Sequence, residues 1–153
     1  MKLYLVQHGE ALTKDIDADR PLSNVGHAEV ERLAAFLAGH MTVSRVMHSG
    51  KTRAQQTAEI FTAIITGEVP VEAISGINPN DSVEDFANRL MNWDEDILVV
   101  GHLPFMSKLV SFLVTGASDV VIVSYTPGSI VFLESTDEGV WQLQWMVRPE
   151  LTN

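Results

Sequence analysis

The chain has 153 residues, of which 46% are hydrophobic and 20% are charged, so it can bury the core of one domain, and we expect a single domain over residues 1–153. Its 20 acidic and 10 basic residues give a net charge of −10, which argues against nucleic acid or an anionic membrane as a partner and requires a local positive pocket for any anionic substrate. The absence of cysteine excludes disulfides, thiolate metal sites and a cysteine nucleophile.

The first predicted element is a strand at residues 2–6, an apolar run that ends just before His8. This run is too short for a signal segment or a membrane span, so the expected location is cytoplasmic. A polar loop follows at residues 10–21, and Ser23 is then expected to cap a helix that Gly39 ends. The apolar residues of this helix recur with helical spacing: Val30, Leu33, Ala34 and Leu37.

The middle of the chain alternates between strands and helices. A short strand at residues 45–47 precedes a helix whose apolar face consists of Ala54, Ala58, Phe61 and Ile65. Ser82 is expected to cap a third helix, with Asp85 in the reciprocal position of a capping box. Residues 97–100 are continuously apolar, as expected of a strand covered on both faces. Pro104 suits the first position of the next helix and Gly116 its end.

The C-terminal part is rich in β-formers and predicts three strands, at residues 120–124, 129–134 and 140–146. Pro127-Gly128 and residues 137–139 supply the turns. Alternating strands and helices followed by this tail predict a three-layer α/β/α sandwich, with a mainly parallel sheet and an antiparallel edge. In such sheets ligands bind outside the carboxyl ends of the strands.

Two histidines are expected at that edge. His8 and His102 each follow an apolar strand and stand within one residue of a glycine, while Arg53 falls at the start of a helix. A histidine with one unprotonated ring nitrogen can attack phosphorus, and an arginine offers a planar set of donors to the transferring phosphoryl group. Lys51 and Arg53 occupy a helix start, where the macrodipole disfavours cations, so either a bound anion relieves the conflict or both side chains extend into water.

Four segments resemble motifs of the histidine phosphatase superfamily, which includes the phosphoglycerate mutases. Gln7-His8-Gly9-Glu10 resembles the Arg-His-Gly motif, the segment 49–58 is similar to Ser-x-x-x-Arg-Ala-x-Gln-Thr, and Val100-Gly101-His102 looks like the second-histidine motif. Arg20-Pro21-Leu22-Ser23 with Gly26 is similar to a segment of the small SixA-like phosphohistidine phosphatases. The matches run in the right order from residue 3 to about residue 110.

This resemblance implies a phosphoglycerate mutase-like fold and a phosphatase that needs no cofactor or metal. His8 would be the nucleophile, and His102 and Arg53 would complete the catalytic set. The substrate-binding residues would be Gln7, Gly9, Arg20, His48 and Ser49. The implied reaction is hydrolysis of phosphohistidine on a partner protein, a phosphorelay or phosphotransfer component, through a covalent phosphohistidine enzyme intermediate. The short stretch between Thr57 and Ile97 leaves no room for a helical lid, and an open pocket favours a phosphate carried by another protein.

One position departs from the family pattern. Gln7 stands where the family has an arginine, which removes a positive charge and a bidentate donor but keeps an amide. His48 and Lys51 are candidates for compensation, and we predict retained activity because His8, Arg53 and His102 remain. Two carboxylic acids, those of Glu10 and Asp81, are possible proton donors for the leaving group, and we assign neither.

Three alternative functions remain open. The first is hydrolysis of a small phosphate monoester, and the second is a non-catalytic phosphate-binding or interaction module, which Gln7 makes plausible. The third is a metal site built from His8, His48, His102 and Glu10, although their spacing matches no compact ligand motif and Arg53 would repel the ion. We expect structural roles for the remaining histidines, His27 and His40, and core or sheet-face positions for Trp93, Trp141 and Trp145.

Overall fold

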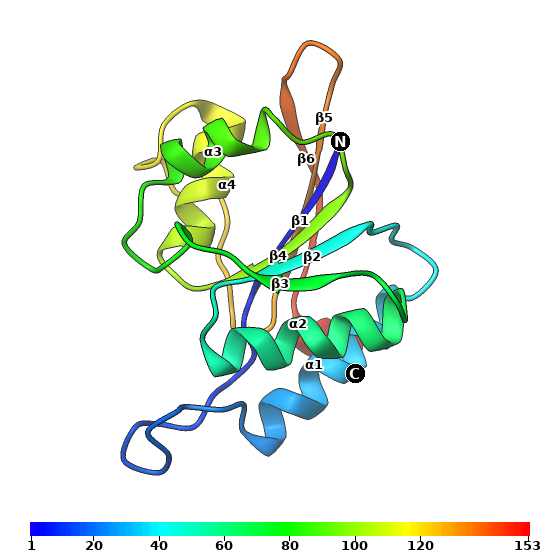
Figure 1. The fold of residues 1–153 in the computed structure, drawn as a ribbon, viewed down its shortest axis with the longest axis vertical. Helices are drawn as coiled ribbons and strands as arrows, with labels where there is room; N and C mark the ends of the chain where they lie inside the picture. The colour runs from blue at the N-terminus through cyan, green and yellow to red at the C-terminus, as the bar shows by residue number, and fades with distance from the viewer.

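A computed structural model describes residues 1–153 and contains one six-stranded sheet between two layers of helices (Figure 1). The strands, in the order in which they lie across the sheet, are β3 (Val71–Ala73), β2 (Arg45–His48), β4 (Ile97–Gly101), β1 (Lys2–Gln7), β5 (Ile130–Ser135) and β6 (Trp141–Val147). The first four run parallel, and β5 and β6 add an antiparallel edge. The predicted three-layer sandwich is therefore confirmed.

Helices α1 (Asn24–Leu37) and α2 (Thr52–Ile65) cover one face of the sheet, and α3 (Val83–Leu90) and α4 (Phe105–Thr115) cover the other (Figure 1). The side chains of β1 alternate between two apolar cores, because Leu3 and Leu5 pack toward α3 and α4 whereas Tyr4 and Val6 pack toward α1 and α2. The three tryptophans pack against these cores as expected. No helix is both long enough and apolar enough to cross a membrane.

The predicted helix ends follow local chemistry. The hydroxyl of Ser23 accepts a hydrogen bond from the backbone N–H of Gly26, and that of Ser82 accepts one from Asp85. Gly116 ends α4 with a positive φ of 81°. Pro104 lies one residue earlier than predicted, as the N-cap of α4.

The strand predicted at residues 120–124 is wrong. This segment is irregular, and Val121 is 81% exposed. The reason is that both neighbours of β1 are already in place, β4 on one side and β5 on the other, so the segment finds no open sheet edge there. It crosses the α3 and α4 face instead, where the hydroxyl of Tyr125 donates to the carbonyl oxygen of Leu5 at 2.9 Å.

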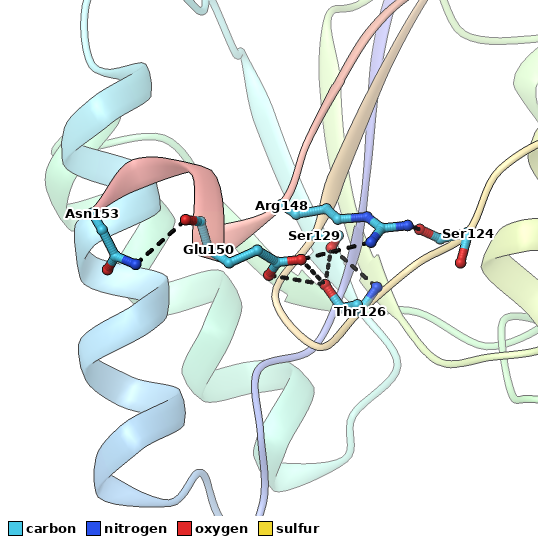
Figure 2. Close-up of polar contacts among 6 residues, drawn as sticks. All are labelled: Ser124, Thr126, Ser129, Arg148, Glu150 and Asn153. Carbon is cyan, nitrogen blue, oxygen red and sulfur yellow. Dashed lines mark hydrogen bonds and ion pairs between the residues drawn. The ribbon is translucent and has the colours of Figure 1, made fainter.

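A short 3₁₀ helix at the C-terminus, η1 (Pro149–Thr152), has no counterpart among the predicted elements. Figure 2 shows how this end is held. The Arg148 guanidinium donates to the carbonyl oxygen of Ser124, and the hydroxyl of Thr126 lies between Glu150 and Ser129. The chain end thereby braces the loop that enters β5.

Candidate active site

His8 lies at the carboxyl end of β1, and two hydrogen bonds define the state of its ring. Its Nδ1 is 2.7 Å from the carbonyl oxygen of Gly9, and because a carbonyl can only accept, Nδ1 carries the proton. Its Nε2 is then unprotonated and accepts a hydrogen bond from Nε of Arg53 at 3.3 Å. The lone pair of Nε2 therefore faces the cationic side chain predicted to bind phosphate.

The surroundings keep this imidazole neutral. Burial lowers the pKa of His8 from 6.5 to about 4; the Gly9 carbonyl opposes this shift, and the positive charges of Arg53 and Arg20 add to it. A histidine can attack phosphorus only when it is unprotonated. At neutral pH His8 is therefore in the form that a nucleophile requires.

His102 follows β4 and lies beside His8, with 5.0 Å between the ring centroids. Its Nε2 is 2.6 Å from the hydroxyl oxygen of Ser49, while its buried Nδ1 has no hydrogen-bond partner. Burial lowers the pKa of His102 to about 3, and repulsion from a protonated His8 and from the Arg53 guanidinium are the next causes. The parallel register explains the pairing, because Gln7 of β1 lies opposite Gly101 of β4.

Thr57 and Gln56 hold the site in place, although neither belongs to the predicted site. The hydroxyl of Thr57 accepts from the backbone N–H of Gly9 at 3.0 Å and donates to the carbonyl oxygen of Arg53 at 2.8 Å. The side chain of Gln56 accepts from the backbone N–H of Leu22 at 2.7 Å, which ties the loop before α1 to α2. The similarity of segment 49–58 to the family motif was the available signal, since both residues fall in it.

The chain after His8 packs tightly against the start of α1. A Cβ built on Gly26 would lie 2.1 Å from the carbonyl oxygen of Glu10, so only glycine permits this approach. The carboxylate of Glu10 accepts from the hydroxyl of Ser23 at 2.9 Å, and that of Asp81 accepts from the backbone N–H of Asn78 at 2.8 Å. Both candidate proton donors thus hold loops in this structure.

Gln7 is 8% exposed and belongs to the buried end of β1. Its backbone N–H donates to the carbonyl oxygen of Ser129, and its own carbonyl accepts from Gly128, which also donates to His8. The side-chain oxygen of Gln7 is buried without a partner. The loop shown in Figure 2 therefore fixes the backbone of Gln7. The side-chain oxygen of Gln7, in contrast, accepts no hydrogen bond that would fix the orientation of the amide group.

His48 and Ser49 end β2 on the other side of β4. The ring of His48 is buried, and its Nδ1 accepts from the backbone N–H of Gly50 at 3.0 Å, which orients the turn into α2. Burial also lowers the pKa of His48. With His48 bound to this turn and Glu10 bound to Ser23, the alternative metal site does not form, and no group of three or more His, Asp or Glu side chains in the chain could hold an ion.

Arg20 lies in the loop before α1, and its Nε donates to the carbonyl oxygen of Leu12 at 3.0 Å. Its charge is the smallest of the causes that lower the pKa values of His8 and His102. Arg20 and Arg53 also line a cavity of about 540 Å³. The other two histidines lie elsewhere, His27 beside Glu31 on the surface of α1 and His40 exposed after it.

Comparison with known proteins identifies the family and the fold of the chain. The model of the histidine phosphatase superfamily (branch 1) matches residues 3–78. The structure of the protein histidine phosphatase SixA complexed with tungstate is similar over 100% of both chains, with a TM-score of 0.88 and 25% identity. No curated protein sequence matches the chain.

Two further solved structures share the fold at lower identity. A putative alpha-ribazole-5'-P phosphatase from Escherichia coli has a TM-score of 0.78 and 20% identity, with 97% of this chain and 98% of that chain covered. A phosphoserine phosphatase mutant from Entamoeba histolytica, in complex with phosphoserine, has a TM-score of 0.74 and 16% identity over the same shares. Phosphatases with different substrates are thus built on this architecture.

Proposed function

Because this chain belongs to the histidine phosphatase superfamily (branch 1), we propose that it hydrolyses phosphohistidine on a partner protein through a covalent intermediate on His8. The observation that carries the proposal is the unprotonated Nε2 of His8, which faces Arg53 while Nδ1 is bound to the Gly9 carbonyl. A neutral nucleophile, a fixed ring and an adjacent guanidinium are what phosphoryl transfer to histidine requires.

The reaction has two steps. In the first, the lone pair of His8 Nε2 forms a bond to phosphorus, the phosphorus–nitrogen bond of the substrate breaks, and its electron pair returns to the substrate imidazole, which takes up a proton. In the second, water attacks phosphorus and His8 departs with inorganic phosphate as the product. Arg53 donates to the phosphoryl oxygens throughout, where negative charge is greatest.

His102 borders the same space as His8. Its Nδ1 is buried, so the ring atom that can exchange its partner for a phosphoryl oxygen is Nε2, which now lies against the hydroxyl of Ser49. We assign it the role of a second contact to the phosphoryl group. The tungstate complex of SixA supports an oxyanion site in a similar structure, since tungstate is an oxyanion like phosphate.

The preference for a phosphoprotein rests on the likeness to SixA over both complete chains and on the short connection between α2 and β4. That connection holds one three-residue strand and one eight-residue helix, which leaves the active site without a helical lid. A phosphoramidate also suits a site whose carboxylic acids are engaged elsewhere, because the departing imidazole is a good leaving group once protonated.

A second candidate is a phosphatase of small phosphate monoesters. The likeness to a putative alpha-ribazole-5'-P phosphatase and to a phosphoserine phosphatase favours it, because both share the fold over nearly the whole chain. A third candidate, a non-catalytic phosphate-binding module, is favoured by the uncharged side chain of Gln7.

Substrate profiling with labelling separates these candidates. Wild-type protein is offered a histidine-phosphotransfer domain carrying ³²P-phosphohistidine, O-phosphoserine and p-nitrophenyl phosphate. We expect fastest turnover of the phosphoprotein and an acid-labile, alkali-stable label on the wild type that His8→Ala lacks. The control is His40→Ala, which removes an exposed histidine and should behave as the wild type. Turnover by His8→Ala equal to that of the wild type would refute the nucleophile, and binding without turnover would favour the module.

A further inference from the structure

A cationic cavity lies beside the phosphoryl site. Its volume is about 540 Å³, and its lining includes Lys14 and Arg20 from the loop before α1 and Lys51 and Arg53 from the start of α2. These are four of the 10 basic residues of a chain whose net charge is −10. Four positive charges therefore lie together in a chain that is strongly negative overall.

None of these four side chains forms a salt bridge. The ion pairs of lysine and arginine lie elsewhere, on Arg45 and Arg148. Asp19 is the one acidic residue that lines the cavity, and it is not close enough to any of the four to pair with it. Like charges crowded without a counter-ion are unfavourable, so the arrangement is best explained by an anionic ligand.

The backbone of the cavity points to the same conclusion. Helix α2 starts at this wall without a side-chain cap and without an acidic residue in its first turn, as α4 does away from the cavity, whereas Ser23 and Ser82 cap α1 and α3. The backbone amides of Thr52 and Arg53 donate no hydrogen bond within the chain, whereas that of Ala54 donates to the carbonyl oxygen of Lys51, so two amides of this turn are available to an anion. Arg20 is the one non-glycine residue with a positive φ, 48°, a conformation that proteins keep mainly where function requires it.

The phosphoryl group uses only part of this charge, since Arg53 contacts His8 directly while Lys14 and Lys51 are exposed on the cavity wall. We propose that the cavity binds a second anionic group of the substrate, a carboxylate, beside the phosphoryl group held at His8. This inference rests on the proposed function and specifies its substrate class. The carboxylate can come from an acidic side chain next to the phosphohistidine of a partner protein, or from a small phosphate ester that carries its own.

Matched substrate pairs separate these two sources. The protein pair consists of two synthetic peptides phosphorylated on a single histidine, one with glutamate and one with glutamine at the flanking positions. The small-molecule pair is O-phosphoserine and phosphoethanolamine, which differ by one carboxylate. We expect the wild type to prefer the carboxylate-bearing member of at least one pair by about 5- to 10-fold in kcat/KM, as for two partly exposed ion pairs.

The variant Lys14→Gln/Lys51→Gln removes two cavity charges, and Lys108→Gln removes an exposed charge on α4 as the control. We expect the ratio of kcat/KM between the two members of a pair to fall toward one in the double variant and to keep its wild-type value in the control. In the wild type, the same ratio should decrease as salt is added. Equal handling of both members of each pair by the wild type, or a full preference in the double variant, would overturn the proposal.

A binding measurement keeps this result distinct from a failure of the proposed function. Dissociation constants of the two phosphopeptides are measured on the His8→Ala protein, which should not turn them over. If no substrate is hydrolysed by the wild type but the glutamate peptide still binds His8→Ala more tightly than the glutamine peptide does, the phosphatase proposal fails and the carboxylate subsite stands. Equal binding of the two peptides would overturn the subsite.

Discussion

Acidification tests the neutral state of His8, on which the proposed chemistry depends. The pKa of His8 is about 4 in the folded protein and 6.5 in an unfolded chain. As the pH falls below 6.5, the unfolded state binds a proton that the folded state does not, so the free energy of unfolding decreases until the pH reaches the folded pKa. The contribution of neutral His8 to stability is thus fully present above about pH 6.5 and is lost progressively as the pH falls from there to about 4.

The size of the effect follows from the two pKa values. Between about pH 7 and about pH 5, a histidine with these values lowers the free energy of unfolding by about 2 kcal/mol. His102 and His48, whose pKa values burial also lowers, act in the same direction.

The assay is urea unfolding of the wild type, His8→Gln and His40→Gln at about pH 7 and about pH 5 and constant ionic strength. We expect the loss of stability on acidification to be about 2 kcal/mol smaller in His8→Gln than in the wild type. The His40→Gln control removes an exposed histidine and should keep the wild-type loss. If His8→Gln loses as much stability as the wild type, His8 is not held neutral by its surroundings and the reasoning fails.

Three further variants test the surroundings of the site. Gly26→Ala would place a Cβ 2.1 Å from the carbonyl oxygen of Glu10, so the backbone must shift, and we expect thermal unfolding to show a loss of about 1–3 kcal/mol. Gly39→Ala, with no atom within 4 Å but a positive φ of 85°, measures the cost of a left-handed alanine without a clash, and it should lose less than Gly26→Ala. Thr57→Val removes the acceptor of a buried backbone amide, and urea unfolding should show a loss of about 1–3 kcal/mol together with a lower kcat. Gln7→Arg should raise kcat/KM for p-nitrophenyl phosphate by about 10-fold or more, and an unchanged or lower rate would contradict a deficit of positive charge.

The parts of the fold that the sequence predicted are those that local chemistry determines. The hydroxyls of Ser23 and Ser82 satisfy helix amides within their own turn, so the caps are readable from a few neighbouring residues. Residues 97–100 are likewise all apolar, so a buried strand can be predicted from these residues alone, and every residue of β4 is buried. The meeting of His8 and His102 required one further rule, that parallel strands present their carboxyl ends at the same edge, and the register of β1 against β4 bears it out.

The errors and omissions concern contacts between distant segments. Residues 120–124 have strand-forming side chains, but a strand also needs an open edge, and the occupancy of both sides of β1 cannot be read from that segment. The hydrogen bond between Thr57 and Gly9 joins residues 48 positions apart, so the hydroxyl looks like an ordinary helix residue until the fold brings them together. The position of Arg20 depends in the same way on Gln56, which ties its loop to α2.

The electrostatics of the site show why overall composition is a poor guide to the ligand. A net charge of −10 implies a chain that repels anions, yet exposed charges are largely screened beyond about 8–10 Å at physiological salt. An anion inside the cavity is therefore governed by Lys14, Arg20, Lys51 and Arg53 and only weakly by the acidic surface beyond them. The acidic surface instead slows the approach of anionic proteins, an effect that grows as the salt concentration falls. A partner must then bring its negative groups close to one another and to the phosphorylated residue, which is the arrangement that the carboxylate preference would detect.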